Sequence, residues 1–231
     1  MKMDIIGFIG VYDKTDLLLN VAKILTTMKK RVLIVDATIE QKTKYVVPAI
    51  NPTFSYVTNF EAFDVAVGFK SLEQIKQYLG EDELQYDIVL INAGFTEAIE
   101  QFGILKAKRN FFVTGFDLYS LKRGLEILSS LKETVNLTKI LFGIEKINEG
   151  NEYLNFLSAN YNIDWNNIEI LVPIELENLE AFMTNQRMQR LRFSNFTVQY
   201  KDALIFIAQE ILGENTDSTI RKIVKMIEKG A

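Results

Sequence analysis

A strand, a loop, a helix and a second strand occupy the first 36 residues, and this unit constrains the fold more than any other part of the chain. Residues 4–9 form an apolar run that ends in a turn at residues 10–16. Apolar side chains then recur at the three- and four-residue spacing of a helix with one buried face: Leu17, Leu18, Val21, Ile24, Leu25 and Met28. The next run, residues 32–35, is apolar throughout and leads into Asp36. A strand that is apolar on both faces is typical of a parallel sheet covered by helices, so we predict a βαβ unit.

The rest of the chain repeats this alternation. Further buried strands are predicted at residues 86–92, 110–114, 138–144 and 168–172, with a β-rich segment at 53–58 and a short element somewhere in 60–69. Helices are predicted at residues 72–79, 117–131, 148–160, 176–183 and 197–212, with a loop and a short helix in 95–107. The predicted fold class is therefore α/β, a three-layer, mostly parallel, doubly wound sheet flanked by helices on both faces. Residues 1–213 are expected to form one domain, and residues 214–231 a C-terminal amphipathic helix.

Composition excludes several kinds of chemistry. The chain has no histidine and no cysteine, which removes Ser-His triads, imidazole bases, the usual zinc sites and thiol chemistry. The net charge of −4 gives no overall attraction to nucleic acid. The sequence has neither a signal-peptide pattern nor an apolar run long enough to cross a bilayer, so the cytoplasm is the expected compartment.

The turn between the first strand and the first helix is a candidate phosphate-binding loop. Lys14 and Thr15 stand where such a loop carries its lysine for the terminal phosphates and its hydroxyl for magnesium. The loop also needs glycines, so that successive backbone N–H groups can turn toward the anion. Asp13 replaces one of these glycines and would place a negative charge beside a phosphate, and Val11 and Tyr12 are bulky where the backbone should approach the ligand. The standard pattern is therefore incomplete.

The order of elements, this loop, and the strands at 32–37 and 86–94 resemble the ParA/MinD family of deviant P-loop ATPases, which includes the TadZ/CpaE-type localisation proteins of pili and flagella. The family loop is similar to K-G-G-x-G-K-[ST]-[ST]. Aligned on its second lysine, this chain matches at Gly10, Lys14 and Thr15 and departs at Ile9, Val11, Asp13 and Asp16. The resemblance implies a P-loop NTPase-like fold, and it extends through segments 113–121, 172–174 and 197–212.

Other departures from the family pattern fall on its metal and water groups. The second strand of the family ends in V-D-x-D; here Asp36 matches, and Thr38 replaces the aspartate that positions water. The aspartate of the third strand that faces magnesium is Asn92. Phosphoryl transfer depends on the metal, the loop backbone and a group that positions water. The resemblance therefore implies a pseudo-ATPase that binds ATP or ADP with Mg²⁺ weakly or not at all.

The residues expected to line a nucleotide site are Gly10, Val11, Tyr12, Asp13, Lys14, Thr15, Asp16, Asp36 and Asn92, and no catalytic or metal-binding residue is assigned. Lys14 is either a phosphate ligand or a solvated lysine at a helix start. Thr15 and Asp16 are expected as helix caps rather than magnesium ligands. Asp36 either caps a turn or pairs with Lys14, and Asn92 is expected to hydrogen-bond the loop.

Three regions are candidate partner surfaces. Arginines 187, 190 and 192 are either a DNA contact, as basic residues are in ParA-like proteins, or a solvated face, which the net charge favours. The C-terminal helix carries Ile220, Ile223, Val224 and Ile227 on one face. That face either meets a membrane surface, as in MinD-like proteins, or packs on the domain or a partner, which the lack of a large aromatic residue favours. Aromatic residues in 45–69 are either a partner surface or core.

These observations lead to one main hypothesis. The chain is a noncatalytic ParA/MinD-like scaffold that localises or regulates a bacterial cell-envelope machine such as a pilus or secretion system. It would act with protein partners, as a homodimer or heterodimer, in the cytoplasm or at the inner face of the membrane. The alternatives are a slow ATPase of the ParA/MinD type that uses substitute residues, and a module that tethers DNA or membrane.

Overall fold

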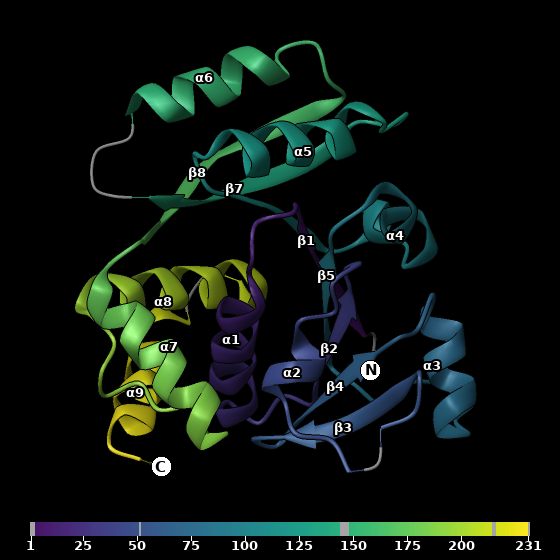
Figure 1. Cartoon of the computed structure of the whole chain (residues 1–231), viewed down its shortest axis with the longest axis vertical. Helices are drawn as coiled ribbons and strands as arrows, with labels where there is room; N and C mark the ends of the chain where they lie inside the picture. Colours follow the sequence, from purple (N-terminus) through teal and green to yellow (C-terminus); the bar gives the residue numbers. More distant parts are fainter. Residues whose placement is uncertain (1–2, 51, 144–147, 214–215, 231) are drawn as a thin grey trace.

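A single sheet of eight strands forms the centre of the molecule (Figure 1). The computed structural model describes residues 3–50, 52–143, 148–213 and 216–230. The strands are β1 Asp4–Ile9, β2 Val32–Ala37, β3 Tyr56–Phe60, β4 Phe63–Val67, β5 Ile88–Ala93, β6 Arg109–Thr114, β7 Val135–Gly143 and β8 Ile163–Pro173. They lie in the order β3-β4-β2-β5-β1-β6-β7-β8, and every neighbouring pair is parallel except β3 and β4.

Helices cover both faces of this sheet. One face carries α1 (Thr15–Thr27), α7 (Leu176–Met188), α8 (Val198–Leu212) and α9 (Asp217–Glu228). The other carries α3 (Leu72–Leu79), α4 (Thr96–Gln101), α5 (Leu118–Ser129) and α6 (Asn148–Ser158). Side chains alternate along a strand, so Phe8 of β1 enters the first core and Ile9 enters the second. The predicted three-layer α/β fold class is confirmed.

The hairpin of β3 and β4 at one edge of the sheet was predicted only in part. Its two-residue turn, Glu61-Ala62, has both residues in the left-handed region, with φ of 51° and 69°. Such turns are usually signalled by Asn-Gly or Asp-Gly, and this sequence gives no such signal. Glu61 instead holds the turn in place, because it pairs with Lys23 of α1 and accepts the backbone N–H of Leu191 at 3.0 Å.

Some other elements exceed their predicted bounds. The strand predicted at 168–172 is the second half of β8, whose first half is polar because β8 is an edge strand with one neighbour. The helix predicted at 176–183 continues to Met188, and the strand predicted at 138–144 begins at Val135, with residue 144 outside the described residues. The short helices α2 (Thr43–Val46) and η1 (Ile104–Lys106, a 3₁₀ turn) complete the chain, and α2 was not predicted.

The C-terminal helix α9 packs on the domain, beside α1 and α8 (Figure 1). Ile220, Val224 and Ile227 are buried, and Ile223 is partly buried against the same core. The membrane surface considered for these four residues is therefore wrong for this structure, and packing on the domain is confirmed. No helix in the described part of the chain is long and apolar enough to cross a membrane.

The aromatic residues between 45 and 69 divide into two groups. Four belong to the core: Tyr56, Phe60, Phe63 and Phe69. Two are exposed, Tyr45 at 77% and Phe54 at 87%. The core alternative is therefore confirmed for the four aromatic residues from Tyr56 to Phe69, while Tyr45 and Phe54 face solvent.

Candidate functional site

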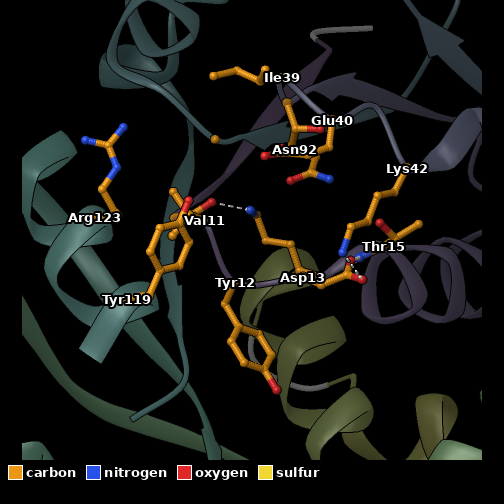
Figure 2. A pocket seen from close by; sticks show the side chains of 14 residues that line it. Val11, Tyr12, Asp13, Thr15, Ile39, Glu40, Lys42, Asn92, Tyr119 and Arg123 are labelled. Carbon is orange, nitrogen blue, oxygen red and sulfur yellow. Dashed lines mark hydrogen bonds and ion pairs between the residues drawn. The ribbon is translucent and has the colours of Figure 1, made fainter. Parts of the chain in front are cut away.

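The candidate site lies where the chain leaves β1. The neighbours of β1 are β5 and β6, and α1 carries the chain past β5 to β2. Connections thus diverge to either side of β1, which is the usual place for a ligand in such a sheet. A cavity of about 220 Å³ opens at this point (Figure 2). It is lined by Gly10, Val11, Tyr12, Asp13, Lys14, Thr15, Thr38, Ile39, Glu40, Lys42, Asn92, Gly94, Tyr119 and Arg123.

Lys14 is turned back onto its own loop. Its side chain is buried, and Nζ donates a hydrogen bond of 2.6 Å to the carbonyl oxygen of Gly10. Burial lowers the pKa of Lys14 to about 8, and the nearby charges of Asp36, Asp13 and Glu40 offset part of that effect. The solvated-lysine alternative is wrong, since only 2% of the residue is exposed. This bond engages one of the three N–H donors of the ammonium group, and Lys14 lines the cavity.

Asp13 supplies a negative charge at the start of α1. Its Oδ1 accepts the backbone N–H of Thr15 at 3.1 Å, and its Oδ2 accepts Nζ of Lys42 at 3.0 Å (Figure 2). Burial opposes ionisation, but these hydrogen bonds outweigh it and lower the pKa of Asp13 below its ordinary value. The N-terminus of a helix is where an anion binds, and here the protein's own carboxylate takes one of its donors. The expectation that Thr15 and Asp16 would cap the helix is wrong.

Asp16 points away from this cavity. Its Oδ2 accepts the side-chain amide of Gln186 at 2.9 Å, which ties α1 to α7. It lines a second cavity, of about 190 Å³, whose wall also includes Tyr12 and Phe142. Burial raises the pKa of Asp16 to about 6. Residues 10–15 of the predicted loop thus line the first cavity, and Asp16 lies outside it.

Asp36 organises the turn after β2. It is 1% exposed, and its two oxygens accept the backbone N–H and hydroxyl groups of both Thr38 and Thr43. It forms no ion pair with Lys14 within 4 Å among the described residues. The capping alternative for Asp36 is confirmed. The carboxylate is already satisfied by four donors, so it has little capacity left for a metal ion.

Asn92 lies beside Asp36 on the neighbouring strand, where the two residues are in register. It is 3% exposed, and its Oδ1 has no hydrogen-bond partner among the described residues. The expectation that it hydrogen-bonds the loop is therefore wrong for this oxygen. A buried amide oxygen without a partner is unusual in a folded protein, and here it borders the cavity (Figure 2).

Two side chains of α5 also line the cavity, and the sequence did not indicate them. Tyr119 and Arg123 lie one helical turn apart and face the cavity from the side opposite Glu40 and Lys42 (Figure 2). Their segment directly follows β6, a strand that also ends at this edge of the sheet. Their position just after the carboxyl end of a parallel strand is the sequence feature that could have identified them.

Several donor and acceptor groups that a magnesium nucleotide could use at this site are already bonded within the chain. Among the described residues, no group of three or more His, Cys, Asp or Glu side chains is arranged to hold a metal ion. Asp36 is saturated, Asn92 is neutral, and the Asp13 carboxylate occupies a backbone donor of the loop. Gly10, with φ of 133°, is required by packing, because a Cβ there would lie 2.2 Å from the carbonyl oxygen of Val113.

The fold of this chain is the one seen in solved structures of MinD and ParA proteins. No family model and no curated protein matches the chain. Among solved structures, it is similar to the septum site-determining protein MinD of Pyrococcus horikoshii complexed with Mg-ADP, with TM-score 0.62, 17% identity and coverage of 95% of this chain and 99% of that one.

Two further solved structures show the same fold. A putative plasmid partition protein of Borrelia burgdorferi bound to AMPPNP has TM-score 0.58 and 13% identity, over 91% of this chain and 97% of that one. The MinC:MinD cell division complex of Aquifex aeolicus has TM-score 0.57 and 15% identity, over 92% and 97%. Likeness at these identities defines the fold, while function depends on the site.

Proposed function

We propose that this chain is a positioning or regulatory scaffold of the ParA/MinD type that does not hydrolyse ATP, and that it serves a bacterial cell-envelope machine such as a pilus or secretion system. The observation that carries the proposal is the Asp13 carboxylate, which accepts the Thr15 backbone N–H at the start of α1. The structures with this fold include proteins named for septum-site determination and plasmid partition, and a complex of MinC with MinD. Those names support a role in positioning through protein partners.

Electrostatics decides against a tightly held phosphate. A phosphate at the Thr15 N–H would lie within about 4 Å of the Asp13 carboxylate, where two like charges repel by about 1 kcal/mol in water and about 4 kcal/mol at an effective dielectric constant of 20. Asp13 is 47% exposed and pairs with Lys42, so solvent and this ammonium group screen the repulsion. A hydrogen bond from an ammonium group such as that of Lys14 returns about 1.5–3 kcal/mol. The Lys14 ammonium already donates to the Gly10 carbonyl oxygen, so one of its three donors is engaged without a phosphate. The attraction and the repulsion are of similar size, so the loop offers a phosphate little net binding free energy.

The water-positioning part of the reaction is also missing. Thr38 stands where the family has its second aspartate, and its hydroxyl already donates to Asp36 and accepts the backbone N–H of Gln41. A hydroxyl that is engaged in this way cannot act as a base toward water. The carboxylate of Asp36 supports this turn through its hydrogen bonds with Thr38 and Thr43, so the turn needs no metal ion.

The test is nucleotide binding and turnover by the purified chain. We expect no ATP binding by calorimetry at about 100 µM protein with Mg²⁺, and no phosphate release above that of Lys14→Ala. Asp13→Gly should raise nucleotide affinity about tenfold, because it removes the repulsion and frees the Thr15 N–H. Asp13→Asn removes the charge but keeps an acceptor for that N–H, so it separates the two contributions and should raise the affinity less. Turnover by the unaltered chain that Lys14→Ala abolishes would overturn the proposal in favour of a slow ATPase.

The scaffold role needs a test in cells. We expect a fluorescent fusion to gather at discrete sites on the envelope, and the Lys14→Ala variant to gather at the same sites. A uniform distribution of the unaltered protein would contradict the scaffold role. Loss of the foci in the Lys14→Ala variant would show that positioning depends on the loop, as it does in an active ATPase.

A further inference from the structure

The outer face of α7 is apolar and has no partner within the described chain. The inner face of this helix packs on the domain through Asn178, Ala181 and Asn185, which are buried. The opposite side exposes Leu176 at 68%, Met183 at 48% and, beside them, Leu179 at 44%. We call Leu176, Leu179, Glu180, Met183 and Arg187 the α7 face. A row of exposed Leu and Met side chains on one helix indicates a surface that meets another protein.

The charges on and beside this face are divided between the two halves of the helix. Glu177 and Glu180 lie in the first half, and Arg187 and Arg190 lie at or just beyond its end. None of the four forms an ion pair among the described residues, in contrast to Arg221, which pairs with two carboxylates. Glu180 and Arg187 are seven residues apart, so they lie on one side of the helix but about 10 Å apart along its axis, too far to pair with each other.

Backbone hydrogen bonds define where α7 ends, and they also set the backbone position of Arg190. Gln189 adopts the left-handed conformation, with φ of 49°. Its N–H donates to the carbonyl oxygen of Gln186 at 3.2 Å, and the N–H of Arg190 donates to that of Asn185 at 3.1 Å. This pair of hydrogen bonds is the usual Schellman ending. The basic end of the helix is therefore a defined structure.

We propose that the α7 face is the interface with a second copy of this chain, whose α7 packs antiparallel to the first about a twofold axis that passes between Met183 and Thr184. Glu180 and Arg187 both lie on the α7 face and are equally distant along the helix from that midpoint. The twofold axis therefore places Glu180 of each copy near Arg187 of the other, and brings the two Met183 side chains together at the centre.

Charge complementarity selects this occupant over others. A parallel pair of α7 helices would place glutamates beside glutamates and arginines beside arginines, which is destabilising. A nucleic acid would meet Glu177 and Glu180 as well as the arginines, and phosphates require an excess of basic groups. An antiparallel copy places Glu180 opposite Arg187, so each charge on the α7 face meets its opposite. The pairing needs no nucleotide, so it does not depend on the function proposed above.

The size of the face sets the expected strength. A helix of 13 residues is about 20 Å long, and one such contact buries less than the 1,200 Å² or more of a stable interface. We therefore expect a reversible dimer with a dissociation constant of about 10–100 µM. The dimer should weaken as the salt concentration rises, because salt screens the paired charges.

The test is sedimentation of the full chain from about 5 to 500 µM. The unaltered chain should dimerise in this range, and Glu180→Arg or Arg187→Glu alone should weaken the dimer at least about tenfold. An equimolar mixture of these two variants should dimerise again, because both facing positions of the mixed dimer then join unlike charges. Glu133→Arg, at an exposed residue away from α7, is the matched control and should change nothing. A monomer throughout the range would overturn the proposal, and so would a mixture no stronger than its components.

A second measurement uses the absence of native cysteine. Met183→Cys should form a disulfide-linked dimer on mild oxidation, whereas Met226→Cys, at a methionine of α9 that is 47% exposed, should remain monomeric. Equal crosslinking of the two variants would contradict the interface. Binding of random duplex DNA that Glu180→Arg strengthens, with no dimer of the unaltered chain, would assign the face to nucleic acid instead.

Discussion

The loop at residues 10–16 and the outer face of α7 treat their charges in opposite ways. In the loop, Asp13 and Lys14 are bonded to groups of the same chain, the backbone N–H of Thr15 and the carbonyl oxygen of Gly10. On α7, Glu180 and Arg187 are exposed and form no ion pair in the part of the chain that the structure describes. At the cavity where this fold usually takes a ligand, these groups are thus bonded within the chain, whereas the charges of the α7 face have no partner among the described residues.

The two regions differ in whether their charged groups are bonded within the chain or solvated by water. A buried charge that loses its partners is costly, because nothing else solvates it. An exposed charge is solvated by water, and its removal costs almost nothing. The loop and its supporting turn should therefore respond to substitution through the stability of the monomer. The α7 face should respond through association. The predictions below separate these two responses.

The largest effect is expected at Asp36. Asp36→Ala leaves the backbone N–H and hydroxyl groups of Thr38 and Thr43 without their acceptor in a buried turn. We expect a loss of about 3 kcal/mol in the free energy of unfolding, or roughly 6–12 °C in Tm for a chain of this size. Urea denaturation measures the first and thermal denaturation the second. A loss under about 1 kcal/mol would show that the turn does not depend on this carboxylate.

A somewhat smaller effect, of opposite sign, is expected at Asp16. Burial raises its pKa to about 6 in the folded chain, above the unfolded value of 3.8. Such a group disfavours folding where it must ionise, above pH 6, and this cost disappears as the pH falls toward 4. Asp16→Asn keeps an acceptor for Gln186 and removes the charge, so it should stabilise the chain by about 2–3 kcal/mol at pH 7.5.

The pH dependence supplies the control for Asp16→Asn. The difference in unfolding free energy between the variant and the unaltered chain should shrink steadily from pH 7 to pH 4 and be near zero below pH 4. Denaturant titrations at four or five pH values measure it. A constant difference would assign the stabilisation to packing against Gln186 and not to the buried charge.

The sequence predicted most of the fold because its central strands are continuous apolar runs. β1, β2, β5 and β6 are buried on both faces, which is typical of parallel strands covered by helices. The hairpin turn at Glu61-Ala62 was missed because its left-handed residues are not Gly or Asn, and tertiary contacts with Lys23 and Leu191 hold it. The first half of β8 was missed because an edge strand need not be apolar.

The position of the candidate site could be predicted from the sequence, but the hydrogen-bond partners of its side chains could not. Spacing alone placed Lys14 at the end of β1 and Asn92 at the end of β5, and the structure brings both to one cavity. The direction of each side chain depends on neighbours distant in sequence. Asp16 turns toward Gln186, 170 residues away, and the cavity receives Arg123 from α5. Such contacts are set by packing, which residue spacing does not encode.

A smaller effect is expected at Asp13. Its side chain is 47% exposed and its partner Lys42 is 54% exposed, so their ion pair lies in solvent and contributes little. Asp13→Asn keeps an acceptor for the Thr15 N–H and should cost about 0.5–1 kcal/mol, mostly through the lost charge at the helix N-terminus. Lys42→Ala is the matched control and should cost no more than about 0.5 kcal/mol. Equal, larger losses in both variants would mean that the ion pair supports the loop.

The smallest effect on folding, and the clearest separation of the two regions, is expected at Arg187. At protein concentrations where the chain is monomeric, Arg187→Ala should change the free energy of unfolding by less than about 0.5 kcal/mol, because the side chain is exposed. At concentrations that populate the dimer, the unaltered chain should gain in Tm as concentration rises, since association stabilises the folded state, and the variant should gain less. Melting curves over a hundredfold range of concentration measure both quantities. If Arg187→Ala destabilised the dilute monomer as much as Asp13→Asn does, the charges of α7 would be structural, and the contrast between the two regions would not hold.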